Sequence, residues 1–367
     1  MNEPIHSGPL NGLKIIEFEG IGPAPLAGQL LSDLGADVVK ILRKHTKIKK
    51  EPILDRNKKT IPLDLKNIND KVIVKKLITK ADVLIEGFRP GVMERLGLGP
   101  KDCEKINPKL VFGRITGWGQ DGPYAKKAGH DINYLAVTGA LNAIGYKNSE
   151  PIPPLNLLGD YAGGTMFLIM GILSALWERN YSNKGQVVDA AMIEGVPSIM
   201  SLIHTLIAQD RWKNIRGSNL LDGGCPFYRC YKTKDDLYVS VGALENKFFA
   251  ILIKKLEMDK KWVQIQENKS KWDELTKELS SIFITKTRNE WEKLFKNTDA
   301  CVEPVLNFDE IEHNNQNKFR KIFIRKNNIL QANISPKFSR SKPQISIKEQ
   351  NQSKNISQVL KSWKINR

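Results

Sequence analysis

The chain has 367 residues, of which 41% are hydrophobic, enough for a sizeable core in two domains or in one domain with an insertion. No apolar run predicts a membrane-spanning helix, and no basic segment followed by an apolar one predicts a secretory signal. The cysteines Cys103, Cys225, Cys230 and Cys301 are few for this length, which is typical of a reducing compartment. Cys225 and Cys230 lack a second pair, so no zinc site is expected, and composition predicts a cytoplasmic globular protein.

The formal net charge of +17 has three interpretations. It can indicate a protein that binds nucleic acid or another polyanion. It can also reflect a lysine-rich surface, and we favour this second interpretation because no RNA- or DNA-binding motif is present. A third interpretation is local: Arg43, Lys44, Lys47, Lys49 and Lys50 follow a predicted strand and could meet a phosphorylated small molecule.

The first 120 residues alternate short apolar runs with helical patterns. Strands are predicted at residues 13–18, 37–42, 60–65, 82–86 and 109–115, and helical segments at 26–34, 71–80 and 92–96. This alternation predicts βαβ units and therefore a parallel sheet. The loop at residues 20–25 resembles a dinucleotide fingerprint but has Pro25 where the third glycine belongs, so NAD is not expected.

The middle of the chain contains a Gly-rich loop at 116–123 and predicted helices at 132–144 and from residue 160 or 161 to about 178. The second helix is apolar nearly all round, which predicts burial on every side. Residues 184–191 predict a strand that leads into another helix, through residue 204.

After residue 214 the composition and periodicity of the sequence change. Residues 216–231 have little periodicity and indicate a linker. A strand is predicted at 237–241, helices over 247–295, and a terminal helix at 356–363. We expect residues 1–210 to form a large Rossmann-like domain, 211–325 a linker with a small α+β domain, and 326–367 a segment that returns to the large domain.

Three ionisable residues are candidates for proton transfer. His130 follows a Gly-rich polar loop, and Asp160 lies where a Pro-rich loop becomes an apolar helix. Each alone has an ordinary structural explanation, since a lone loop histidine is often exposed and Asp160 is a good helix N-cap. Together they are a proton-transfer pair, and the N–H groups of residues 159–164 could stabilise an oxyanion. Glu245 follows a strand, and spacing alone cannot bring it to His130.

At this point the sequence resembles the α-methylacyl-CoA racemases of the family III CoA-transferase superfamily. The resemblance covers about residues 10–340 and rests on several long motifs. These are residues 12–17, 81–92 (ADVLIEGFRPGV), 128–134 (AGHDINY), 154–160 (PLNLLGD), 185–190, 221–224, 241–245 and 298–305.

The resemblance implies a role for each matched residue. His130 and Asp160 match the two groups that exchange the α-proton on opposite faces of C2, and Glu245 matches the partner that orients and charges the histidine. Contacts to CoA are implied for Arg43, Leu63, Asp64, Leu65, Lys66, Arg89, Gly129, Asp131, Ile132, Asn133 and Tyr134. It also implies a homodimer with interlocked chains.

The expected function is racemisation of (2R)- and (2S)-2-methylacyl-CoA thioesters in fatty acid and lipid metabolism, with no metal or redox cofactor and no nucleic acid or membrane partner. The alternative is an acyl-CoA:carboxylate CoA-transferase with Asp160 as nucleophile. A third, non-catalytic alternative is a basic binding protein, which only the net charge favours. The acyl chain, the pathway and the role of the lysine-rich tail do not follow from the sequence.

Overall fold

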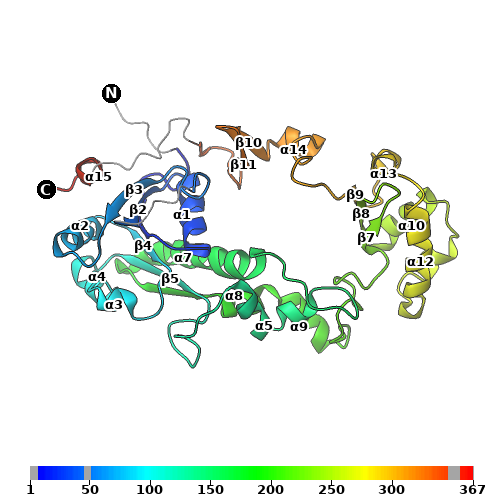
Figure 1. Cartoon of the computed structure of the whole chain (residues 1–367), viewed down its shortest axis with the longest axis horizontal. Coiled ribbons are helices and arrows are strands. Elements are labelled where there is room, and N and C mark those ends of the chain that lie inside the picture. The colour runs from blue at the N-terminus through cyan, green and yellow to red at the C-terminus, as the bar shows by residue number, and fades with distance from the viewer. Residues whose placement is uncertain (1–6, 45–50, 346–355, 367) are drawn as a thin grey trace. The chain divides into compact units, whose positions relative to one another are not determined.

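The computed structural model describes residues 7–44, 51–345 and 356–366 (Figure 1). The chain folds into two compact units, each interrupted in sequence. The first unit comprises Met1–Thr138, Leu155–Ile199 and Lys321–Arg367, and the second comprises Gly139–Pro154 and Met200–Arg320. The domain division expected from the sequence stays a prediction, and each unit is described by itself below.

The first unit is built on a parallel sheet of six strands in the order β3-β2-β1-β4-β5-β6. The strands are β1 (Lys14–Phe18), β2 (Asp37–Arg43), β3 (Lys59–Leu63), β4 (Val83–Glu86), β5 (Val111–Thr116) and β6 (Val187–Ala191). This order is that of the doubly wound dinucleotide-binding folds. The predicted Rossmann-like parallel sheet is therefore confirmed.

Helices cover both faces of this sheet, because successive strand residues point to opposite sides. Ile15 and Val38 face one core with α1 (Pro23–Asp33) and α7 (Met166–Ser182). Their neighbours Ile16 and Val39 face the other core. The helices that contribute to this second core are α2 (Ile68–Ile78), α3 (Val92–Arg95), α4 (Pro100–Ile106) and α15 (Ile356–Ser362).

The predicted helix at 132–144 is wrong in its extent. It is two short helices, α5 (Asp131–Val137) and α6 (Ala140–Ala143), on either side of Gly139. Gly139 has a φ of 82°, in the left-handed region, where a helix cannot continue. The first segment of the first unit ends at Thr138, just before Gly139, since α6 belongs to the second unit.

The long apolar helix also differs from the prediction. It starts as a π-helix, η1 (Leu157–Thr165), and continues as α7. Only one face of α7 is buried, through Leu168 and Ile172, whereas Met170 and Trp177 are exposed. By length and composition alone, Leu157–Ser182 could cross a membrane, although no such segment was expected; α7 packs on β5 and β6 of the sheet.

The first unit is completed by α8 (Met192–Ile199) and, at its C-terminal end, by the hairpin β10 (Phe323–Lys326) and β11 (Ile329–Ala332). The hairpin and α15 both contact residues of the N-terminal part of the chain. Arg56 binds the carboxylate of Asp33 and also Gln331 and the carbonyl of Ala332. Trp363, just after α15, is fully buried and donates from Nε1 to Asp37.

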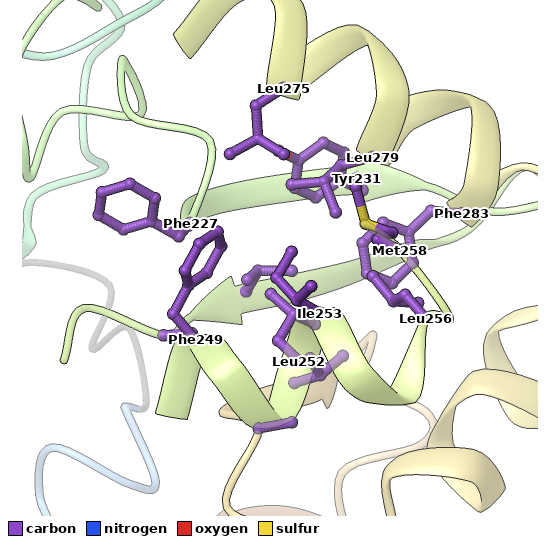
Figure 2. Packing of buried hydrophobic residues seen from close by; sticks show 14 of the residues in the cluster. Phe227, Tyr231, Phe249, Leu252, Ile253, Leu256, Met258, Leu275, Leu279 and Phe283 are labelled. Carbon is purple, nitrogen blue, oxygen red and sulfur yellow. The ribbon is translucent and has the colours of Figure 1, made fainter. Parts of the chain in front are cut away.

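The second unit contains an antiparallel sheet, β7 (Tyr228–Lys232), β8 (Tyr238–Gly242) and β9 (Val302–Pro304), in that order. Strand β7 lies where the sequence indicated a linker. The helices are α9 (Ser201–Ala208), α10 (Asn246–Lys255), α11 (Lys261–Gln264), the 3-10 turn η2 (Lys269–Lys271), α12 (Trp272–Phe283), α13 (Arg288–Phe295) and α14 (Asn315–Arg320). Figure 2 shows part of the hydrophobic core of this unit, in which Phe249 of α10 packs on Phe227 and Phe283 of α12 stacks on Tyr231. The expected smaller α+β unit is therefore present.

Candidate active site

The carboxyl ends of the parallel strands gather most of the predicted site residues along one edge of the sheet. Arg43 ends β2, Leu63 ends β3, and Arg89 follows β4. The loop after β5 leads on to His130. Ligands of open α/β sheets bind beyond this edge, where the strand order reverses, which here is between β1 and β4.

His130 is exposed and directly precedes α5. Its backbone N–H donates to Oδ1 of Asn133 at 3.0 Å, which fixes the start of the helix. The buried Tyr134 holds the preceding residue, because its hydroxyl donates to the carbonyl of Gly129. The Tyr134 ring packs edge-on against Trp118, with 4.8 Å between ring centroids. The loop is therefore anchored, while the imidazole remains accessible.

Asp160 is half-buried and lies inside η1, so the expected N-cap position is wrong. Its backbone N–H donates to Oδ1 of Asp131 at 2.6 Å. Asn156 donates from Nδ2 to the Asp160 carboxylate at 3.4 Å. The loop before α1 also comes close, since a Cβ added to Gly22 would lie 3.0 Å from Oδ2 of Asp160.

The surroundings of Asp160 favour a carboxylate that binds protons more tightly than an exposed one. Burial raises its pKa, and the negative charge of Asp131 raises it further. The hydrogen bond from Asn156 and a charged imidazole at His130 act in the opposite direction. The hydrogen bond between the Asp160 N–H and Asp131 joins the segment that carries Asp160 to the residue that follows His130.

The remaining expected CoA contacts differ in their accessibility. Leu63 is buried in the core, and the Asp131 carboxylate is turned inward toward η1. Asp64 accepts a hydrogen bond from the backbone of Lys66. Positions with an exposed side chain are Arg43, Lys66, Arg89, Ile132 and Asn133; Leu65 is half-buried. Lys47, Lys49 and Lys50 of the basic cluster lie outside the described residues, whereas Lys44 pairs with Asp70.

Glu245 belongs to the second unit, where it is exposed and precedes α10 directly after β8. The structure therefore brings together His130, Asp131 and Asp160, and it describes Glu245 separately. Sequence reasoning missed Gly22 and Asn156 as neighbours of Asp160. Asn156 lies within one of the recognised motifs, but nothing in the spacing aims its amide at the carboxylate. Among the described residues, no group of three or more His, Cys, Asp or Glu side chains is placed to hold a metal ion.

Sequence comparison assigns the family. The family model described as CoA-transferase family III matches residues 10–349, and the chain belongs to this family. Alpha-methylacyl-CoA racemase of Mus musculus is 43% identical over 315 residues, which cover 86% of this chain and 82% of that protein. The racemase of Homo sapiens is 41% identical with the same coverage.

The fold agrees with that of a solved structure. The crystal structure of a CAIB/BAIF family protein from Brucella suis aligns with a TM-score of 0.82 at 23% identity. The alignment covers 97% of this chain and all of that one. At this level of identity the likeness shows the fold alone.

Proposed function

We propose that the protein is an isomerase, a racemase that interconverts (2R)- and (2S)-2-methylacyl-CoA thioesters by proton exchange at C2. The observation that carries this proposal is the hydrogen bond from the N–H of Asp160 to the carboxylate of Asp131, which joins the segment that carries Asp160 to the residue next to His130. The identity of 43% to a racemase supports the same reaction.

The proposed reaction uses one base on each face of the substrate. The α-proton of a thioester is weakly acidic, so the base gains from a raised pKa, as burial provides for Asp160. One group removes the proton, an enolate-like anion forms, and the other group returns a proton to the opposite face. Inversion follows because the donor and the acceptor are different residues.

The developing oxyanion needs N–H donors. The N–H of Asp160 is already bound to the Asp131 carboxylate, so it is not free for this purpose. The N–H of Gly159 also acts on Asp131, so of the residues 159–164 only those from 161 onward remain as expected donors. Glu245 belongs to the proposal as the group that orients His130 and stabilises its charged imidazole.

The wider setting belongs to the proposal as well. We infer a homodimer, supported by apolar side chains exposed along α7, namely Met166, Met170, Trp177 and Tyr181. No cofactor is required beyond the CoA of the substrate, and no nucleic acid or membrane partner is invoked. A cytoplasmic place in fatty acid and lipid metabolism fits the substrate class.

A single incubation tests the activity. The protein is mixed with one epimer of a 2-methylacyl-CoA in D2O, and deuterium at C2 is measured together with the epimer ratio. Deuterium uptake with loss of stereochemical purity is the expected result. If C2 stays unlabelled while CoA moves to an added free acid, the protein is instead a CoA-transferase that uses Asp160 as nucleophile.

The role of His130 is tested by His130→Ala. We expect exchange to fall at least about a hundredfold, since general acid–base catalysis contributes roughly that much, with folding preserved because the side chain is exposed. His313→Ala removes an exposed imidazole elsewhere in the chain and is the matched control. Unchanged exchange in His130→Ala would remove His130 from the mechanism.

A further inference from the structure

Asp131 lies next to His130 in sequence, but its side chain is directed to Asp160. The residue is 8% exposed, and its Oδ1 accepts the N–H of Asp160 at 2.6 Å across 29 residues of sequence. The N–H of Gly159 also acts on this carboxylate. No cation of the described residues pairs with it, and Oδ2 has no hydrogen-bond partner there. Asp131 is thus a buried carboxyl group held by backbone donors.

The backbone of η1 leaves room for the Asp131 carboxylate at Gly159. A Cβ added to Gly159 would lie 2.5 Å from Oδ1 of Asp131 and 2.8 Å from its Cγ, which is closer than real atoms approach. Only glycine at position 159 lets the carboxylate reach the N–H groups. The contact therefore depends on two residue types at once, Asp131 in the loop that carries His130 and Gly159 in η1.

We propose that Asp131 is a positioning residue for Asp160: its buried carboxylate holds the backbone of Gly159 and Asp160 and keeps a negative charge beside the Asp160 side chain. This inference rests on the proton-transfer function proposed above. It assigns to the Asp131 side chain a role in the reaction, in place of the direct CoA contact that the resemblance implied.

The geometry accounts for the hydrogen bond between Asp131 and the backbone of Asp160. The charge accounts for an aspartate at this position. An uncharged acceptor would satisfy the same N–H groups without burying an anion, which is costly when no cation compensates. The retained charge lies close enough to raise the pKa of Asp160. Other groups acting on this cluster are His130 and Asn156 on Asp160, and Arg89, whose charge acts on Tyr134.

Asp131→Asn keeps an oxygen acceptor and removes the charge. We expect kcat for deuterium exchange to fall about tenfold with KM unchanged, because an Asp160 of lower pKa by one unit is a weaker base by up to about that factor. The acid limb of the pH profile should move to lower pH. Asp131→Leu removes the acceptor as well, and kcat should fall about a hundredfold through misplacement.

Asp102→Asn is the matched control, because the Asp102 side chain also accepts a backbone N–H, that of Gly99, but at α4. It should leave kcat, KM and the pH profile unchanged. Thermal unfolding separates the proposed role from a purely structural one. Burial raises the pKa of Asp131, so its ionised form destabilises the fold above that pKa, and Asp131→Asn should be at least as stable as the wild type at neutral pH.

A readout that does not need turnover keeps the inference separate from the proposed function. Carboxyl-¹³C NMR titration of labelled aspartates, with Asp160→Asn for assignment, measures the pKa of Asp160 directly. A lower pKa of Asp160 in Asp131→Asn is expected even if the wild type exchanges no deuterium, in which case the proposed function alone fails. An unchanged Asp160 pKa, or an Asp131→Asn effect confined to KM, overturns the positioning role.

Discussion

Asp160 lies in surroundings that act on its pKa in both directions. Burial and the charge of Asp131 raise the pKa, whereas Asn156 and His130 lower it. The balance is toward a raised value, which suits a base that must take a proton from carbon. A substitution at Asn156 can change the pKa of Asp160 with little effect on the backbone. The reason is that Asn156 contacts the Asp160 carboxylate through its side-chain amide.

This gives a prediction on the pH dependence of exchange. A protonated carboxyl cannot accept a proton, so exchange of the epimer that uses Asp160 as base falls as pH drops through its raised pKa. In Asn156→Ala, loss of the hydrogen bond to the ionised form should raise that pKa and move the acid limb to higher pH. The measurement is the initial rate of deuterium uptake against pH for each epimer. An acid limb that stays in place would show that the Asn156 amide does not act on Asp160.

Glu17 and Lys58 form an ion pair in which both side chains are fully buried, with 2.6 Å between Nζ and Oε2. Lys58 also donates to the carbonyl of Pro25 in the first turn of α1. The pair thus ties β1 to the helix that follows the Gly22 loop. Burial raises the pKa of Glu17 and lowers that of Lys58, because it disfavours the charged form of each. Each charge is in turn stabilised by the opposite charge of its partner.

Breaking this pair should destabilise the first unit strongly. Lys58→Met leaves Glu17 buried without its cation, and we expect a loss of about 3–5 kcal/mol in the free energy of unfolding. The loss should grow as pH rises, because a Glu17 of raised pKa is tolerated only when protonated. Urea unfolding of Lys58→Met, Glu17→Gln and the double variant measures it. A double variant less stable than Lys58→Met would contradict this account.

At the scale of elements, η1 and α8 approach each other more closely than side chains would allow. A Cβ added to Gly195 of α8 would lie 1.9 Å from the carbonyl oxygen of Gly163 in η1. A Cβ on Gly163 would in turn lie 2.9 Å from the backbone N of Val196. Two glycines therefore permit backbone contact between the segment that carries Asp160 and its neighbour.

Gly195→Ala tests this contact. The added methyl must push η1 and α8 apart, and overpacking of this kind costs about 1–3 kcal/mol. The variant should unfold at lower urea concentration and lose exchange activity, because the displaced segment carries Asp160. Gly242→Ala is the control, since the nearest atom to its added Cβ lies 4.0 Å away. Equal stability of both variants would mean that η1 yields without strain.

Elements differ in how well the sequence predicts them. Strands such as β2 and β4 come from apolar runs that are buried on both faces, and their predicted bounds agree within a residue. The π-helix η1 has no such local pattern in the sequence, and its contacts include those with α8 and with Asp131, which are distant along the chain. The exposed face of α7 was predicted to be buried because periodicity reports hydrophobicity, not what covers it.

The candidate site shows the same division. Residue types and motifs are enough to nominate His130 and Asp160, because both precede or enter helices in recognisable loops. The inward turn of the Asp131 carboxylate is a contact across 29 residues and has no signature in spacing. Glu245 was nominated by resemblance alone, and its role stays a prediction.

The whole molecule is a discontinuous one, in which the first unit draws its last elements from the end of the chain. Val359 and Leu360 of α15 are buried in the same core as Ile16 and Val39 of the central strands. Trp363 is fully buried and binds Asp37 at the start of β2. The described part of the lysine-rich tail thus includes a piece of the core.

Trp363→Ala should therefore destabilise the N-terminal sheet from a distance in sequence. We expect a loss of about 3–5 kcal/mol, typical of a buried aromatic residue replaced by alanine. Trp363→Phe should lose less, because it keeps most of the packing and gives up the hydrogen bond to Asp37. Lys361→Ala, an exposed change on α15, should stay within about 0.5 kcal/mol. Chemical unfolding of the three variants measures this, and a Trp363→Ala stability near wild type would contradict it.

The place of α15 also affects the order in which the molecule can form during synthesis. The ribosome releases the strands of the parallel sheet early, at about 5–20 residues per second, and α15 follows the whole second unit. Synthesis of the intervening residues takes on the order of ten seconds. During this time the face of the sheet that packs on Trp363 lacks α15. A nascent chain stalled before residue 356 would present that apolar surface to chaperones, whereas the second unit, whose residues are then all synthesised, could already fold.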